Sequence, residues 1–279
     1  MPEGDSLHRL AAQLAPILIG KAPVAFELTR KTGDGSGVIG QTVTGVEARG
    51  KNLLVHFESG LSLHVHLKMW GRAFIWPLAT AKRSAGPNTV LVLDTDTHRV
   101  VVAEAPVARL LRTRDLVRDL HFRHLGPDLL APSFDQDEAL RRLSLRKQQP
   151  LGEALMDQSA VAGVGNVWKS ELCFNLRLDP FAPVAAHREE ELRALLVMAR
   201  EQMQKSVAHR PRALPDPFTP RAARAPRLEP RLGQGPTSVY GRAGERCYDC
   251  GTKVEMKRQG ETLRSTYYCP HCQPTRSAA

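Results

Sequence analysis

The opening stretch of the chain carries apolar residues at helical spacing. They fall on one face of a helix, at Leu7, Leu10, Ala11 and Leu14. This i, i+3, i+4 spacing is typical of an amphipathic helix. Because proline lacks the N–H that a helix interior requires, we predict a helix over residues 4–15 that ends at Pro16.

From about residue 24 to residue 120 the apolar positions form short runs typical of β-strands. Glycine and polar residues separate these runs, which favours a β-sandwich or barrel. The clearest expected strands are residues 42–46, 52–57, 61–67, 89–93 and 99–103.

Helical spacing returns after residue 125. The expected helices are residues 134–146, 151–158, 166–175 and 188–205. The Gly-Pro-Asp sequence at residues 126–128 separates the two patterns, and we place a domain boundary there.

Residues 206–238 differ in composition from the rest of the chain. They contain seven prolines and six arginines and almost no apolar periodicity. We predict a flexible basic linker, a solvated connector that could also contact a phosphate backbone. The predicted organisation is an N-terminal domain (1–125), a helical domain (126–205), this linker and a C-terminal region (239–275).

Four of the five cysteines form two Cys-x-x-Cys pairs separated by eighteen residues. They are Cys247, Cys250, Cys269 and Cys272. In a reducing compartment this spacing predicts one tetrahedral Zn²⁺ site; four thiolates complete its coordination, so the metal is structural. We interpret His271 as a bystander between two ligands and Cys173 as a small buried hydrophobic residue.

Length, charge and hydropathy limit the possible classes of protein. A chain of 279 residues can form one large or two ordinary domains. The excess of 39 basic over 29 acidic residues favours a polyanionic partner, although it also serves solubility. No apolar run approaches the roughly 18–20 residues of a membrane span, and no signal-peptide pattern is present. We therefore expect a cytoplasmic protein with no membrane partner.

The N-terminal sequence suggests covalent chemistry. If Met1 is removed, the secondary amine of Pro2 becomes the N-terminus, beside the carboxylate of Glu3. An N-terminal amine has a pKa of about 7.7–8.0, so part of it is uncharged and nucleophilic near neutral pH. Attack on an aldehyde-level carbon would give an iminium. The alternative is that proline merely suits a first helical turn.

Two loops carry residues suited to phosphate. Gly163 and Gly165 can adopt positive φ, and Asn166 is then expected to cap the next helix, whose N-terminus would bind phosphate. An ordinary helix–turn–helix corner is the alternative. Lys51 follows Arg-Gly at a predicted hairpin tip, where a lysine is often simply solvated.

Six separated motifs together resemble the Fpg/Nei family of DNA glycosylases, and most closely its endonuclease VIII (Nei) branch. They are residues 1–4, 49–51, 125–130, 155–158 with 162–166, 239–242, and the four-cysteine finger with Arg264. The similarity extends to about residue 273, except over the linker. It implies an α+β multidomain fold: an N-terminal helix with a β-sandwich, a helix-two-turn-helix domain and a C-terminal zinc-finger β-hairpin.

The resemblance implies a bifunctional enzyme that removes oxidised bases and cuts the strand by β,δ-elimination. Pro2 would attack the anomeric carbon, and Glu3 would act as general acid on the deoxyribose. Lys51, Asn166 and Arg264 would hold phosphates next to the lesion, and Lys51 and Arg264 would assist elimination. The reaction requires no nucleotide cofactor.

Further residues match family positions less directly. Glu171 matches a carboxylate near the amine, and we expect it to support catalysis. Met69 and Trp70 lie where relatives fill the gap left by an everted base; the alternative is that both pack in the core of the sandwich. His124 stands where Nei relatives have a phosphate-contacting arginine, and an imidazole could make that contact pH-sensitive.

Departures from the family pattern bear on the substrate. Ser6 replaces a glutamate found in many relatives, with Asp5 before it, and residues 104–114 show no Arg/Phe wedge loop of the Fpg type. Together with the Nei-like start, this favours oxidised pyrimidines over 8-oxoguanine. We expect a monomer that acts on damaged DNA at the nucleoid.

Two other classes of function remain open from the sequence. The fold could serve a non-catalytic, structure-specific DNA-binding protein, although such a protein would not need the Pro2-Glu3 pair. A zinc-ribbon accessory factor would leave the first 240 or so residues unexplained.

Overall fold

The computed structural model describes residues 2–29, 35–81, 86–208 and 237–276. These residues form two compact units, which divide between Arg123 and His124. Each unit is considered by itself below. Within the described ranges, no helix combines the length and apolar character needed to cross a membrane.

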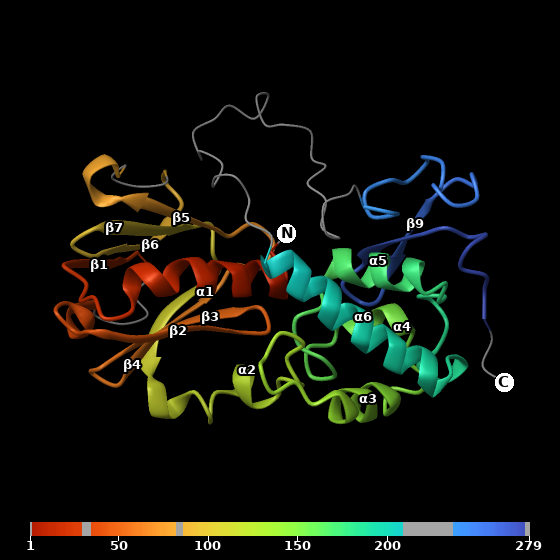
Figure 1. Ribbon diagram of the computed structural model, residues 1–279, viewed down its shortest axis with the longest axis horizontal. Helices are drawn as coiled ribbons and strands as arrows, with labels where there is room; N and C mark the ends of the chain where they lie inside the picture. The colour runs from red at the N-terminus through yellow and green to blue at the C-terminus, as the bar shows by residue number, and fades with distance from the viewer. Residues whose placement is uncertain (1, 30–34, 82–85, 209–236, 277–279) are drawn as a thin grey trace. The chain divides into compact units, whose positions relative to one another are not determined.

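The first unit places one helix between two antiparallel four-stranded sheets (Figure 1). Helix α1 spans Gly4–Leu18. One sheet has the order β1 (Ala25–Leu28), β6 (Thr89–Asp94), β7 (His98–Ala103) and β5 (Arg72–Pro77). The other has the order β2 (Val43–Arg49), β3 (Asn52–Phe57), β4 (Leu61–His66) and β8 (Val107–Arg112). A short helix α2, Leu120–Arg123, ends this unit.

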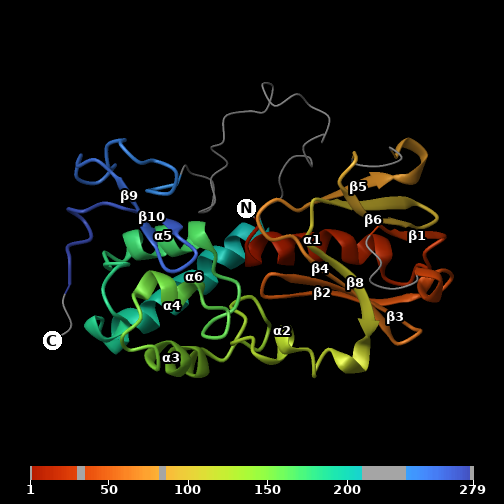
Figure 2. The same ribbon diagram turned by 180° about the vertical axis from the view of Figure 1, so that it is seen from behind.

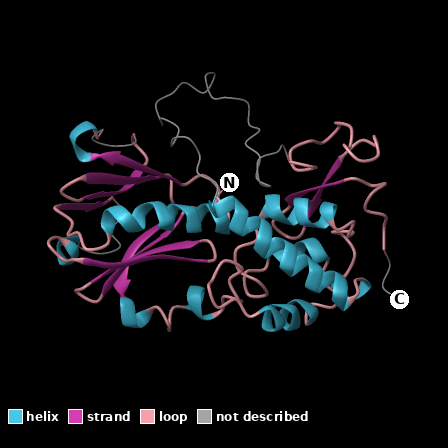
Figure 3. Ribbon diagram, viewed as in Figure 1, coloured by secondary structure: helices cyan, strands magenta, loops and turns pink. Residues whose placement is uncertain are grey.

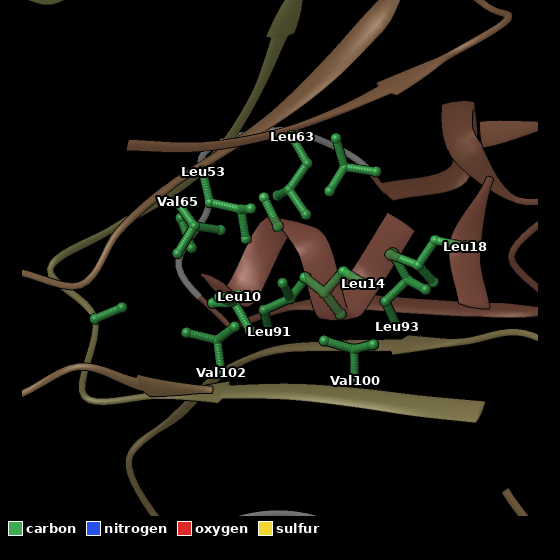
Figure 4. Close-up of a cluster of buried hydrophobic side chains, with 14 of the residues drawn as sticks. Leu10, Leu14, Leu18, Leu53, Leu63, Val65, Leu91, Leu93, Val100 and Val102 are labelled. Atoms are coloured by element: carbon green, nitrogen blue, oxygen red, sulfur yellow. The ribbon is translucent and has the colours of Figure 1, made fainter. Parts of the chain in front are cut away.

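The core of the first unit forms around α1, whose apolar side chains contact both sheets (Figure 4). Leu10 and Leu14 lie between the inward residues of β3 and β4 on one side and those of β6 and β7 on the other. The helix continues through Pro16 to Leu18, so the prediction that it ends at Pro16 is wrong. Leu18 is only 1% exposed, and its burial offsets the backbone hydrogen bond that Pro16 cannot donate.

All five predicted strands are present, with ends shifted by one to three residues. Strands β1, β5 and β8 were not among them. The first has only four residues, and the other two have irregular burial and, in β8, two arginines. Their sequences therefore lack the alternation that identifies a half-buried strand.

The second unit combines four helices with a β-hairpin (Figure 3). The helices are α3 (Gln136–Ser144), α4 (Leu151–Met156), α5 (Asn166–Asn175) and α6 (Glu189–Ala208), and the hairpin strands are β9 (Glu255–Gln259) and β10 (Arg264–Tyr268). Every residue of α5 except the last is buried, which makes it the central element of the unit. The predicted helices and fold class are confirmed.

The segment before α3 packs against the loop that precedes α5. Gly126 N–H donates to the Gln158 carbonyl, and a Cβ at position 126 would lie 2.6 Å from the Ala160 carbonyl oxygen. Only glycine therefore permits this approach of two backbones. Of the predicted linker 206–238, residues 206–208 end α6, and residues 209–236 lie outside the described ranges.

Candidate active site

Pro2 lines a pocket of about 350 Å³ in the first unit. The pocket lies between the N-terminal turns of α1 and the first residues of β5. Its wall combines apolar side chains with hydroxyl, amide and guanidinium groups, and its residues are Pro2, Ser6, Arg9, Leu10, Gln13, Leu67, Gly71, Arg72, Ala73 and Phe74. This arrangement can hold a planar polar group beside the N-terminal amine.

The backbone of Glu3 begins helix α1, and its side chain is 1% exposed. The Glu3 carbonyl accepts hydrogen bonds from the N–H groups of Ser6 and Leu7, at 3.0 and 3.2 Å. Asp5 is also buried and pairs with Arg9 at 3.3 Å. The carboxylate next to position 6 is therefore engaged with a pocket residue, and Ser6 presents only a hydroxyl to the pocket.

Lys51 lies in the two-residue turn between β2 and β3. Arg49 pairs with Asn52 across this turn, and Gly50 has φ +57°, which favours glycine. The Lys51 side chain is half-buried. A tight hairpin therefore presents the lysine, as its sequence predicts.

Residues 67–71 form a tight turn that presents Met69 and Trp70 to solvent. Their side chains are 40% and 70% exposed, so the interpretation that they pack in the core is wrong. The turn closes when Gly71 N–H donates to the Leu67 carbonyl at 2.8 Å. A Cβ on Gly71 would lie 2.5 Å from that carbonyl oxygen, so this position requires glycine.

In the second unit, one face of α5 holds strand β10 through side-chain hydrogen bonds (Figure 2). Asn166 Nδ2 donates to Ser265 Oγ at 3.0 Å. The buried Lys169 ammonium donates to Thr266 Oγ1 at 2.7 Å and to the Ser265 carbonyl at 3.3 Å. Lys169 was not singled out from the sequence, because a lysine inside a helix gives no local sign of burial.

Asn166 does not cap α5, contrary to the prediction. It is the first helical residue, Gly165 precedes it at the N-cap with φ −119°, and no side-chain cap is present. Gly163, with φ +110°, is the glycine of this loop that uses the left-handed region. Asn166 Oδ1 is buried and has no hydrogen-bond partner among the described residues.

Glu171 is fully buried and accepts three backbone hydrogen bonds. Its carboxylate receives the N–H groups of Ser238, Val239 and Tyr240 at 2.7, 3.0 and 2.8 Å. The conserved-looking Val-Tyr-Gly-Arg motif is thereby anchored to α5. The carboxylate positions backbone at this point.

Arg264 begins β10 and is half-buried. It lines a second pocket of about 430 Å³ together with Lys169, Gln259 and residues of α4. The turn before it contains Gly260, with φ +71°, and Leu263, with φ +48°. The structure therefore brings Arg264 and Asn166 to the same α5–β10 contact, while Pro2 and Lys51 belong to the first unit. His124 is the exposed first residue of the second unit.

The four cysteines form one cluster in the second unit, with all four sulfur atoms within 4.8 Å of one another. Cys247 Sγ lies 4.0 Å from Cys272 Sγ, and Cys250 Sγ lies 3.5 Å from Cys269 Sγ. Tetrahedral Zn²⁺ with Zn–S bonds of about 2.3 Å separates its sulfur ligands by about 3.8 Å. The cluster therefore fits such an ion.

The two remaining residues considered with the cysteines are where the sequence predicted them. His271 is exposed and outside the cluster. Cys173 is completely buried in the core of the second unit, and this burial raises the pKa of its thiol to about 12. Cys173 is therefore an unreactive core residue.

Comparison with known proteins gives a consistent result. The family model described as formamidopyrimidine-DNA glycosylase N-terminal domain matches residues 1–115, and that of the formamidopyrimidine-DNA glycosylase H2TH domain matches residues 125–214. A Streptomyces coelicolor protein named probable endonuclease 8 2 is 36% identical over 98% of this chain and 94% of its own length. A Mycolicibacterium smegmatis protein named DNA-(apurinic or apyrimidinic site) lyase Nei2 is 34% identical, over 98% and 99%.

The fold also matches solved structures. A crystal structure of Lactococcus lactis Fpg in complex with DNA containing N7-benzyl-Fapy-dG aligns with a TM-score of 0.79. The sequences are 21% identical, and the alignment covers 98% of this chain and all of the other. The chain belongs to the Fpg/Nei family of DNA glycosylases, and its relatives named endonuclease 8 support the Nei branch.

Proposed function

We propose that this chain is a DNA glycosylase and abasic-site lyase of base excision repair, which removes oxidised pyrimidines and cuts the strand by β,δ-elimination. The observation that carries the proposal is the position of Pro2 on the wall of a pocket with both apolar and hydrogen-bonding groups. An N-terminal secondary amine there lies beside a space suited to a planar base. The relatives named endonuclease 8 and abasic-site lyase support the same reaction.

The chemistry follows from the processed N-terminus. The Pro2 nitrogen attacks C1′ of the damaged nucleotide, the N-glycosidic bond breaks, and the base leaves with the bonding electrons. Glu3 donates a proton to the ring oxygen, which opens the sugar and leaves an iminium on C1′. The iminium acidifies C2′–H, so the 3′ phosphate and then the 5′ phosphate leave. Water then releases the amine.

Three residues are proposed to hold the phosphates around the lesion: Lys51, Asn166 and Arg264. The tight turn supports this role for Lys51, because it limits the backbone freedom of the lysine. Amide oxygen and nitrogen are assigned from the hydrogen-bond network. If the Asn166 amide turns over, Ser265 Oγ can donate to Oδ1, and Nδ2 becomes available to a phosphate oxygen.

The other candidate residues have supporting tasks in this proposal. Met69 and Trp70, exposed on a rigid turn, enter the space left by the everted base. His124, which is exposed, contacts the DNA backbone near the domain boundary. Glu171 supports catalysis indirectly, since its carboxylate anchors residues 238–240.

We propose one structural Zn²⁺, held by the thiolates of Cys247, Cys250, Cys269 and Cys272. The ion would fix the ends of the hairpin that carries Arg264. The protein would act as a monomer on chromosomal DNA in the cytoplasm, with domains as delimited by its sequence.

The pocket composition supports a preference for oxidised pyrimidines. Arg9, Gln13 and Arg72 supply hydrogen-bond donors that match the carbonyl oxygens of a saturated or oxidised pyrimidine. Ser6 replaces the longer carboxylate side chain of many relatives and leaves room at this wall. We expect single-turnover excision of thymine glycol and 5-hydroxyuracil to be at least tenfold faster than excision of 8-oxoguanine.

Borohydride trapping on a duplex with one abasic site tests the covalent step. The mature protein should form an adduct that peptide mass analysis assigns to Pro2. Pro2→Gly should retain some strand cleavage through its primary amine and lose most base excision. Lys51→Ala is the matched control, because it should still be trapped. Absence of any adduct, with tight binding retained, would instead indicate a non-catalytic DNA-binding protein.

A further inference from the structure

The turn that carries Lys51 is closed by a buried amide, that of Asn52. Asn52 is 1% exposed, and its Nδ2 donates to the Arg49 carbonyl on the other side of the turn at 2.9 Å. Its Oδ1 accepts two further hydrogen bonds, from His64 Nε2 at 2.9 Å and from His121 Nε2 at 2.8 Å. One side chain therefore joins the tip of the β2–β3 hairpin to strand β4 and helix α2.

The two histidines are themselves connected, so the hydrogen bonds form a closed ring. Arg109 on β8 donates from Nε to His64 Nδ1 at 3.2 Å and from Nη2 to Asp119 Oδ2 at 2.6 Å. Asp119 Oδ1 accepts from the backbone N–H of His121 at 2.9 Å. These five residues, named the Asn52 ring below, are Asn52, His64, Arg109, Asp119 and His121.

The ring determines where the protons lie. An amide oxygen only accepts, so both histidines carry a proton on Nε2. The Arg109 guanidinium only donates, so His64 Nδ1 carries none, and His64 is neutral. Burial, followed by the charge of Arg109, lowers the pKa of His64 to about 3, and burial also lowers the pKa of His121. The ring is therefore intact at neutral pH.

Lys51 directly precedes Asn52 and extends toward the same region. Burial, followed by the nearby charges of His121, Lys68 and Lys51, lowers the pKa of His66 to about 4. The Lys51 ammonium therefore lies close enough to the edge of the ring to affect a neighbouring titration. A lysine has several rotatable bonds, and a fixed backbone reduces the entropy lost when its ammonium contacts a phosphate.

We infer that the Asn52 ring positions Lys51 for strand cleavage, with Asn52 as the positioning residue. The inference rests on the proposed phosphate contact of Lys51. The Asn52 side chain remains within the protein and does not contact substrate. Its three hydrogen bonds fix the turn against two other elements, so the Lys51 ammonium starts from a defined position.

A double-mutant cycle on the full-length protein tests this inference. The variants are Lys51→Ala, Asn52→Ala and the double variant, and the measured quantity is the single-turnover rate of strand cleavage at saturating abasic-site duplex. Lys51→Ala should slow cleavage at least tenfold and Asn52→Ala at least fivefold. The double variant should be no slower than Lys51→Ala, because Asn52 acts through the lysine. The fraction trapped by borohydride should stay within twofold of wild type in all three.

Two further variants keep the test independent of folding. Asn52→Asp accepts from both histidines but cannot donate to the Arg49 carbonyl, so its rate should fall between those of wild type and Asn52→Ala. His121→Ala removes one of the three hydrogen bonds at the surface end of the ring and should slow cleavage severalfold. Thermal unfolding should show each variant to be folded at the assay temperature.

The possible results separate the two levels of the argument. Wild-type cleavage by Asn52→Ala, or an equal slowing by Asn52→Ala in the presence and absence of Lys51, would overturn the positioning role and leave the proposed function intact. Full-rate cleavage by Lys51→Ala would remove the proposed phosphate contact, and the inference would fail with it.

Discussion

Asn166 and Ser265 lie 99 residues apart in the sequence, yet the side-chain amide of Asn166 donates to the Ser265 hydroxyl at 3.0 Å. One turn further along α5, Lys169 donates to Thr266, and Ser170 Oγ accepts from the backbone N–H of Tyr267 at 3.2 Å. The helix therefore contacts consecutive residues of β10, directly after Arg264. The position of that arginine depends on side chains far from it in the sequence.

Substitution of Glu171 should loosen the second unit. In Glu171→Gln, one carboxylate oxygen becomes an NH₂ group that cannot accept from Ser238 or from Val239 and Tyr240. Loss of charge-assisted hydrogen bonds with burial of an unpaired group should cost about 2–3 kcal/mol. Urea unfolding should report this loss, and the amides of residues 238–240 should exchange faster with solvent. Glu190→Gln, at an exposed position of α6, is the control and should leave both measurements unchanged.

Zinc removal should affect the hairpin selectively. We expect elemental analysis to find one zinc per chain. Chelation should increase hydrogen exchange across residues 239–273 and suppress strand cleavage, because Arg264 then lacks a fixed position. Cys250→Ser should have the same effect, whereas Cys173→Ala should retain the metal, since Cys173 lies in the apolar core. A metal-free protein with an equally protected hairpin would contradict the structural role.

The exposed turn at residues 67–71 allows a test of base eversion. Trp70 is 70% exposed, so Trp70→Ala should change the free energy of unfolding by less than about 0.5 kcal/mol. Base excision from a duplex should nevertheless slow at least tenfold. Cleavage of a preformed abasic site should slow less, because no base has to leave the stack. Equal slowing on both substrates would argue against insertion of this side chain.

Gly71→Ala tests whether the shape of this turn matters. Its Cβ would lie 2.5 Å from the Leu67 carbonyl oxygen, so the backbone must move. We expect destabilisation of about 1–3 kcal/mol and slower excision. Gly45→Ala is the matched control, because a Cβ there would make an ordinary 3.5 Å contact with the His56 ring. That variant should keep wild-type stability and activity in the same assays.

The buried histidines should make stability depend on pH below neutrality. The pKa of His64 is lowered from 6.5 to about 3 and that of His66 to about 4, in both cases chiefly by burial. The unfolded chain therefore takes up protons between pH 6.5 and 4.5 that the folded protein does not. Stability should fall as the pH falls through this window, by at most about 2 kcal/mol per histidine at pH 5.

His64→Gln isolates one of these contributions. Its amide can donate to Asn52 Oδ1 and accept from Arg109 Nε, so the hydrogen bonds of His64 are retained without a titrating group. Urea unfolding at pH 7 and pH 5 should show a smaller loss of stability than in wild type. His98→Gln should retain the wild-type loss. An unchanged pH dependence in His64→Gln would show that His64 does not remain neutral in the folded protein.

Local patterns in the sequence predicted the elements with strong periodicity and the motifs made of neighbouring residues. Helix α1, the five regular strands and the cysteine cluster follow from spacing alone. The end of α1 did not, because burial of Leu18 outweighs the effect of Pro16. Strand β8 was missed because its pairing with β4, rather than its own pattern, defines it.

The candidate site shows the same division. Pro2, Lys51 and Arg264 were identifiable because each belongs to a recognisable motif. Lys169 and Asn52 were not, because their importance arises from hydrogen bonds to residues distant in the sequence. The predicted cap at Asn166 was wrong for a related reason: a partner on β10 takes the side chain that local rules assign to the helix start.

Because α5 and β10 are joined side chain to side chain, the two segments form a single heritable module. A hairpin transplanted from another glycosylase would meet the amide, ammonium and hydroxyl groups of α5 without their matching acceptors. Exchange between homologous enzymes should therefore succeed when both segments travel together, and engineers who graft the finger alone should obtain folded but misaligned hybrids.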